Sequence, residues 1–290
     1  MGPVEIKPCS LTLGPVLFNW PAARWRDFYF RIADESPFES VVIGETVCEK
    51  RLPFLPPHLE DAVERLRRAG KDVSVATLGL ISSDRERDAA EAPLDMVDVL
   101  VEANDVSTVA ALAGRPHAIG AMINTYNEGT LKYFVDRGAV RVCLPPELPA
   151  GSIAALAAAT DVDLEVQVFG RQPLAISSRC YHARSRGLSK DGCQFVCADD
   201  PDGMVIETLE GEPFLAVNGT QTLSLSYLNL SADLDTLKSM GIRRFRLSPQ
   251  NVDMIGVAAI FAEILGGQIG ADEGDARLGD LCPDVSFSNG

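Results

Sequence analysis

The chain has 290 residues, of which 46% are hydrophobic, and its formal net charge at pH 7 is -15. This length and composition suffice for one large α/β domain with a full hydrophobic core, so disulfide staples are not needed for stability. The negative charge repels phosphate backbones and argues against general nucleic-acid binding.

Short apolar segments alternate with amphipathic ones along nearly the whole chain. The first clear pair is a buried strand at 40–44 followed by a helix at 57–71, in which apolar residues recur at helical spacing. Further strands are predicted at 72–78, 98–102, 117–122, 140–145, 164–170, 214–219 and 244–248. Further helices are predicted at 104–114, 127–138, 151–160, 231–241 and 252–267.

This alternation predicts an α/β fold with a parallel sheet. Seven or eight such units match a (β/α) barrel of the TIM type in size, and a doubly wound open sheet is the alternative. We expect one barrel-like domain over residues 1–267, with a cysteine loop at 177–203. The acidic, Gly-rich segment 268–290 is predicted to be a flexible tail.

The first residues lack the basic and apolar regions of a signal peptide, and no apolar run is long enough for a membrane span. We therefore expect a soluble protein of the reducing cytoplasm. The chain has seven cysteines, an odd number, which in that compartment favours free thiols or metal ligands over disulfides.

In a (β/α) barrel, functional residues follow the C-terminal ends of the strands. The barrel prediction therefore brings Cys48 to the same face as the cysteine loop. Polar residues at the other strand ends are candidates for substrate binding or for support of a metal site. These candidates are Glu45, Asn124, Asn127, Glu147 and Asn218.

Three cysteines of the loop, Cys180, Cys193 and Cys197, have the spacing C-x12-C-x3-C. Cys48 would complete a set of four thiolates, which both zinc and iron-sulfur clusters accept. The spacing alone does not favour one of these metals over the other. His182 is predicted to lie near the ligands or on the surface without binding metal.

Charged residues near these cysteines have two candidate roles. Arg179 and Arg184 offset the negative charge of a thiolate site or contact a substrate, and Lys190 belongs to the same basic group. Glu165 opens a predicted strand, so we expect it to be a structural ion-pair partner.

Several motifs between about residue 11 and residue 254 are specific in combination, although each alone is weak. They are LGPVLFNWP at 13–21, IGETVCEKR at 43–51, INTYN at 123–127, RVCLPPEL at 141–148, PLAISSRCYHARS at 173–185, the C-x3-C at Cys193, VNGTQTLS at 217–224 and RLSPQ at 246–250. Together they closely resemble the UbiV family, in the UbiU/UbiV branch of the collagenase-like peptidase superfamily.

The resemblance implies a 4Fe-4S cluster held by Cys48, Cys180, Cys193 and Cys197. It also implies a heterodimer with UbiU that supports oxygen-independent hydroxylation of the ubiquinone precursor ring, with prephenate as the hydroxyl donor. A lipid-binding quinone carrier protein is a further partner implied for this pathway of anaerobic ubiquinone biosynthesis. The catalytic residues are not defined by the resemblance.

In this region the sequence is similar to the pattern E-x-x-x-H-G of peptidase members of the superfamily. This chain has Glu165 and Gly170 at the first and last positions of the pattern, but Phe169 in place of the histidine. A phenyl ring neither binds metal nor transfers protons, so we do not expect peptidase activity. Two alternative functions remain from the sequence. One is prephenate-dependent hydroxylation of RNA bases, and the other is a non-catalytic binding module whose metal stabilises the cysteine loop.

Overall fold

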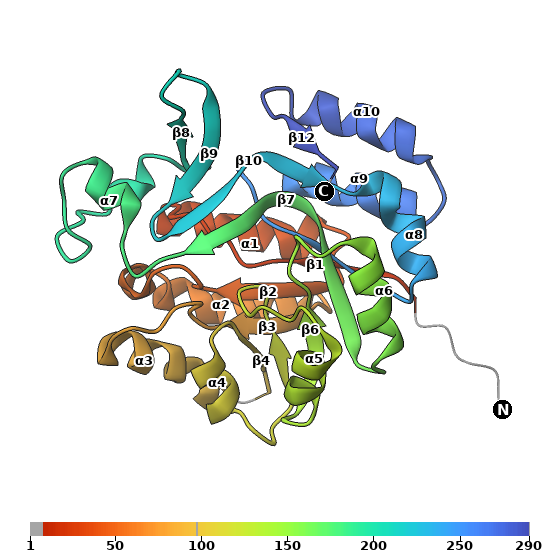
Figure 1. Ribbon diagram of the computed structural model, residues 1–290, viewed down its shortest axis with the longest axis horizontal. Coiled ribbons are helices and arrows are strands. Elements are labelled where there is room, and N and C mark those ends of the chain that lie inside the picture. The colour runs from red at the N-terminus through yellow and green to blue at the C-terminus, as the bar shows by residue number, and fades with distance from the viewer. Residues whose placement is uncertain (1–7, 97, 290) are drawn as a thin grey trace.

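The computed structural model describes residues 8–96 and 98–289, and its centre is a closed barrel of eight parallel strands (Figure 1). The barrel closes because β11 pairs with β1 on one side and with β7 on the other. This closure confirms the predicted (β/α) barrel and excludes the open sheet. The barrel strands are β1 (Ser10–Leu13), β2 (Ser40–Gly44), β3 (Asp72–Ala76), β4 (Leu100–Ala103), β5 (His117–Ile119), β6 (Ala139–Cys143), β7 (Asp163–Ile176) and β11 (Arg244–Leu247).

Helices follow the barrel strands and cover the outside of the barrel (Figure 1). In the first helix the buried residues Trp25, Tyr29 and Ile32 recur three or four positions apart, which is one face of an α-helix. None of the helices in the described residues has the length and hydrophobicity to cross a membrane. The surrounding helices are α1 (Ala22–Glu35), α2 (Pro56–Arg68), α3 (Asp84–Glu91), α4 (Val106–Ala111), α5 (Glu128–Val135), α6 (Ala150–Ala158), α8 (Leu234–Ser239) and α9 (Met254–Leu265).

A long insertion separates β7 from α8 and contains the cysteine loop. The second half of β7 leaves the barrel and pairs antiparallel with β10, which pairs in turn with β9. The segment 214–219, predicted as a barrel strand, is therefore a strand of this antiparallel extension instead. The elements of the insertion are α7 (Tyr181–Ser185), the 3-10 helix η3 (Val196–Ala198), β8 (Met204–Glu207), β9 (Pro213–Asn218) and β10 (Gln221–Asn229).

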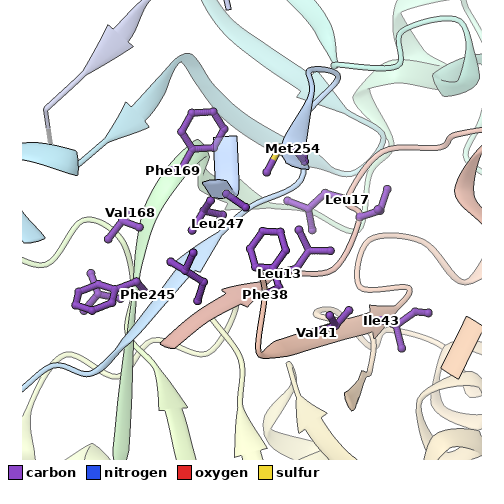
Figure 2. Close-up of a cluster of buried hydrophobic side chains, with 14 of the residues drawn as sticks. Leu13, Leu17, Phe38, Val41, Ile43, Val168, Phe169, Phe245, Leu247 and Met254 are labelled. Carbon is purple, nitrogen blue, oxygen red and sulfur yellow. The ribbon is translucent and has the colours of Figure 1, made fainter. Parts of the chain in front are cut away.

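Charged side chains fill the middle of the barrel. The buried guanidinium of Arg246 pairs with Glu102 and with Glu165, which come from β4 and β7. Although burial alone would raise the pKa of Glu165, the guanidinium groups of Arg246 and Arg141 hold it below its usual value. Glu165 is thus a structural ion-pair partner, as the sequence predicted. The hydrophobic core lies outside this layer, between the strands and the helices, and Figure 2 shows part of it.

Phe169 belongs to this outer core rather than to the barrel interior. Glu165 pairs in register with Arg244, but a β-bulge between Gln167 and Phe169 breaks the alternation of side chains along β7. Phe169 is fully buried and lies beside Leu247, its register partner in β11 (Figure 2). Its ring makes edge contacts with aromatic rings of β10 and α9, those of Tyr227 and Phe261.

The C-terminal segment differs from the prediction. Instead of a flexible tail, residues 268–290 include α10 (Ala271–Leu281) and β12 (Phe287–Ser288). α10 packs against α9 with Leu278 fully buried, and β12 pairs with β10 (Figure 1). The high content of Gly and acidic residues obscured this helix, because its apolar face consists of few residues.

Candidate functional site

The cysteine loop lies on the loops that follow β1 and β2. Asn19 donates from Nδ2 to the sulfur of Cys197 at 3.4 Å, and Trp20 donates from its indole nitrogen to Pro201 O at 2.8 Å. Thr220, which directly precedes the return strand β10, donates from its hydroxyl to Val47 O at 3.0 Å. The motifs around 13–21, 43–51 and 217–224 are therefore parts of one contact region.

A buried arginine, Arg51, connects these loops. It lies in the 3-10 helix η1 (Glu49–Phe54) and is only 3% exposed. Its Nη1 donates to Leu17 O at 2.6 Å, and its Nη2 donates to Asn218 Oδ1 at 3.0 Å. Glu45 lies 3.8 Å from Arg51 and partly balances its charge. Gly219 has a positive φ of 63°, and a Cβ there would lie 3.0 Å from Nη2, so glycine suits this close approach.

The four candidate ligand cysteines lie in this neighbourhood. Arg51 interacts electrostatically with Cys48 and Cys197, and Cys180 interacts with Cys193 and Cys197. Cys180 and Cys197 are buried, whereas Cys48 and Cys193 are half-buried, and all four are free thiols. The barrel thus brings Cys48 to the cysteine loop, as the rim argument from the sequence predicted.

The donor chemistry of this group fits a thiolate-ligated metal, but the spacing is not that of a single-ion site. In residues 8–96 and 98–289, no three His, Cys, Asp or Glu side chains lie close enough together to hold one metal ion. A four-iron cluster is larger than one ion, so its ligand sulfurs stand farther apart than those of zinc.

Burial changes the acidity of two of these thiols. It raises the pKa of Cys48 to about 12, although the nearby guanidinium of Arg51 acts in the opposite direction. Burial likewise raises the pKa of Cys180. Both are therefore thiols at neutral pH without a metal, and metal binding must displace their protons.

His182 holds the cysteine loop in position through hydrogen bonds of both its ring nitrogens. It is fully buried, and its Nε2 lies 2.7 Å from Asp200 Oδ2. Its Nδ1 accepts a hydrogen bond from Gly219 N at 3.4 Å. Because Nδ1 is an acceptor, the ring proton is on Nε2 and points to Asp200. Both nitrogens are thus engaged within the protein.

Two ion pairs that the sequence analysis did not predict attach residues 190–191 of the cysteine loop to α3 and η1. Lys190 Nζ lies 2.5 Å from Glu86 Oε1 in α3, and Asp191 lies 3.2 Å from Lys50 Nζ. The buried Glu49, next to Cys48, accepts from Arg85 Nη2 at 2.6 Å. The charged residues of 82–91 are typical of a solvent-exposed helix face, so the sequence of this segment did not indicate these contacts.

The remaining predicted candidates separate into supporting and distant residues. Glu45 is buried, accepts from Val47 N at 2.7 Å and from Cys48 N at 3.0 Å, and has its pKa raised by burial. It therefore shapes the turn that presents Cys48. Asn127 is exposed and caps α5 by accepting from Thr130 N at 2.9 Å, so its amide already has a structural role.

Four further candidates are exposed. Asn124 is exposed near Asn127, and Glu147 accepts from Tyr126 OH at 2.5 Å. The contact between Glu147 and Tyr126 does not involve the cysteine loop. Arg179 and Arg184 are also exposed, but they line a cavity together with Cys180.

Comparison with known proteins places the chain in a family. This chain is similar to a solved U32 peptidase, Mk0906, with 14% identity, a TM-score of 0.48, and coverage of 87% of this chain and 97% of that chain. It is also similar to Mycobacterium tuberculosis tryptophan synthase, with 11% identity, a TM-score of 0.35, and coverage of 97% and 94%. Residues 23–263 match the sequence profile described as Peptidase family U32, and the chain belongs to that family.

Proposed function

We propose that this chain is a UbiV-type subunit that carries a 4Fe-4S cluster on Cys48, Cys180, Cys193 and Cys197. With UbiU it would support oxygen-independent hydroxylation of the ubiquinone precursor ring in the cytoplasm, with prephenate as the hydroxyl donor. The observation that carries the proposal is the gathering of these four free thiols around the loops held by Arg51. The sequence motifs supply the identity of the partner and substrate.

Each part of the site has a definable task in this proposal. A thiolate-bound iron-sulfur cluster, when present, supplies a one-electron centre. Arg51 places positive charge beside Cys48 and Cys197, and this charge acts to lower the pKa of Cys48 against the effect of burial. Asn19 donates a hydrogen bond to the sulfur of Cys197, and such donors tune the potential of sulfur-ligated metals.

Membership of a peptidase family does not by itself supply a proteolytic site here. Phe169 occupies the histidine position of the E-x-x-x-H-G pattern, and its side chain is buried among aromatic rings. Glu165, the acidic residue of the same pattern, is committed to the ion pair with Arg246 inside the barrel. Neither residue is available to activate water, so we do not propose proteolysis.

The test is the iron and acid-labile sulfide content of protein purified without oxygen, together with its visible spectrum. The wild type is expected to hold about four iron and four sulfide per chain. Cys193→Ala should lose them, whereas Cys282→Ala, a buried cysteine next to α10, should keep them. About one zinc without sulfide in the wild type would overturn the cluster and favour a structural clamp.

The role in quinone synthesis needs a separate test. A strain that lacks this chain should fail to make ubiquinone without oxygen, and the wild-type chain, but not Cys193→Ala, should restore synthesis. Co-purification with UbiU should accompany restoration. Full anaerobic hydroxylation by UbiU alone would show that the proposed function is wrong. Altered modified nucleosides with normal quinone levels would favour RNA hydroxylation.

A further inference from the structure

A cavity of about 470 Å³ lies on the cysteine loop beside Cys180. Its lining comes from residues around α7, including Ser178, Ser189 and three cationic side chains. The volume is within the range of small-molecule sites, roughly 300–1,000 Å³. The cavity is therefore large enough for a small metabolite, and its chemistry is set by the charges around it.

The three cations of the lining are Arg179, Arg184 and Lys190, and they differ in how they are paired. Lys190 is held by Glu86 at 2.5 Å. Arg179 and Arg184 are exposed, and no acceptor contacts either guanidinium within residues 8–96 and 98–289.

The other arginines of the described chain provide the contrast. Each of them donates to a carboxylate, an amide oxygen or a backbone carbonyl, or forms an ion pair. In a chain with net charge -15, acidic partners are abundant. Two unpaired guanidinium groups at one cavity are therefore a localised departure from the rest of the molecule.

The geometry of the groups favours an oxyanion ligand. A guanidinium offers a planar fork of donors that matches a carboxylate or phosphate group. Ser189 Oγ accepts a hydrogen bond from Gly192 N at 3.1 Å, which leaves its hydroxyl proton free to donate. A ligand with two oxyanion groups could engage both forks, with Lys190 adding to the positive potential.

We infer that this cavity binds a small organic anion that carries two oxyanion groups, either carboxylates or phosphates. The inference deepens the proposed function and rests on it for the source of the ligand, because prephenate, the proposed hydroxyl donor, itself carries two carboxylates. If Arg179 and Arg184 only balanced the negative charge of the thiolates, the cavity would not bind a small anion selectively. Selective binding of a small anion therefore separates the two roles.

The experiment is calorimetric titration of the purified full chain with malonate and with inorganic pyrophosphate, at low ionic strength. Sodium chloride at matched ionic strength serves as the reference. We expect saturable binding of at least one anion. Arg179→Gln and Arg184→Gln should each weaken it about tenfold, which corresponds to about 1.4 kcal/mol. Arg186→Gln removes an exposed charge from the same loop outside the cavity, so its affinity should stay within about twofold of the wild type.

Binding of malonate alone would identify a dicarboxylate ligand, and binding of pyrophosphate alone a phosphorylated one, and both support the inference. Absence of binding by the wild type, or an equal loss in Arg186→Gln, would overturn it. Binding of a single-stranded oligonucleotide, lost in the double variant while both small anions fail to bind, would also overturn it. Melting temperatures and iron content of the same preparations keep misfolding and failure of the cluster proposal distinguishable from loss of the anion site.

Discussion

Arg51 Nη2 donates a hydrogen bond to Asn218 Oδ1 at 3.0 Å, and both side chains also donate to the carbonyl oxygen of Leu17 at 2.6 Å. This buried cluster joins the loop after β1, the loop after β2 and the end of β9. Those three segments surround the candidate ligand cysteines, so the position of the cysteine loop depends on one buried cation.

Arg51→Met is expected to destabilise the chain by about 3–5 kcal/mol, because it leaves the buried Glu45 and Asn218 without their partner. Urea unfolding gives the change in the free energy of unfolding. Arg65→Met, which removes an exposed pair with Asp34, should cost about 1 kcal/mol or less. Equal losses in the two variants would contradict a special role for Arg51.

The Lys190–Glu86 pair should make attachment of the loop sensitive to acid. Burial would raise the pKa of Glu86, but hydrogen bonds from Lys190 and Ser82 lower it from 4.5 to about 2. A lowered pKa means that the stabilisation is fully present above about pH 4.5 and is lost as the pH falls through about 2.

Hydrogen exchange of the amides in residues 186–193 tests this pair. Protection should be constant from neutral pH to about pH 5 and then fall as Glu86 is protonated, after correction for intrinsic exchange rates. Glu86→Gln should show reduced protection already at neutral pH. Asp84→Asn, which alters an exposed pair with Arg87 in the same helix, should leave protection unchanged. Protection in Glu86→Gln equal to that of the wild type would refute the tether.

The barrel was predictable from the sequence because its strands and helices alternate with little interruption. The strand β1 was missed because it has four residues and is followed at once by Gly14 and Pro15. The segment containing β9 was misassigned because an apolar run of five or six residues looks the same in a parallel barrel and in an antiparallel extension. Only the pairing partner distinguishes them, and that partner is a tertiary property.

The proximity of Cys48 to the cysteine loop was predictable because parallel strands all end at one rim. Arg51 was not predictable, since a single arginine in a polar segment resembles a surface residue. Its burial becomes visible only when Leu17 and Asn218, far apart in the sequence, supply acceptors. For Arg179 and Arg184 the sequence indicated charge compensation or substrate contact, but it does not show that these two arginines lack partners and share one cavity.

Phe169→His tests whether the family pattern can be restored at this position. The imidazole would replace a ring packed against Tyr227 and Phe261, where the surrounding contacts are aromatic. Burying a polar group without a partner costs about 1–3 kcal/mol, so the variant should unfold at lower urea and gain no peptidase activity. Phe214→His changes an exposed ring and should be close to neutral. Peptide hydrolysis by Phe169→His would contradict our assignment of this side chain to the outer core.

The C-terminal helix α10 should contribute to stability rather than behave as a dispensable tail. Leu278 is fully buried between α10 and the rest of the domain, and Asp275 accepts from Asn229 Nδ2 at 2.8 Å. Leu278→Ala should therefore lower the free energy of unfolding by about 2–5 kcal/mol in urea titrations. Leu209→Ala makes the same change at a fully exposed position and should alter stability by about 0.5 kcal/mol or less. If both variants unfolded at the same urea concentration, α10 would not be part of the cooperative domain, because burial of Leu278 would then add nothing to its stability.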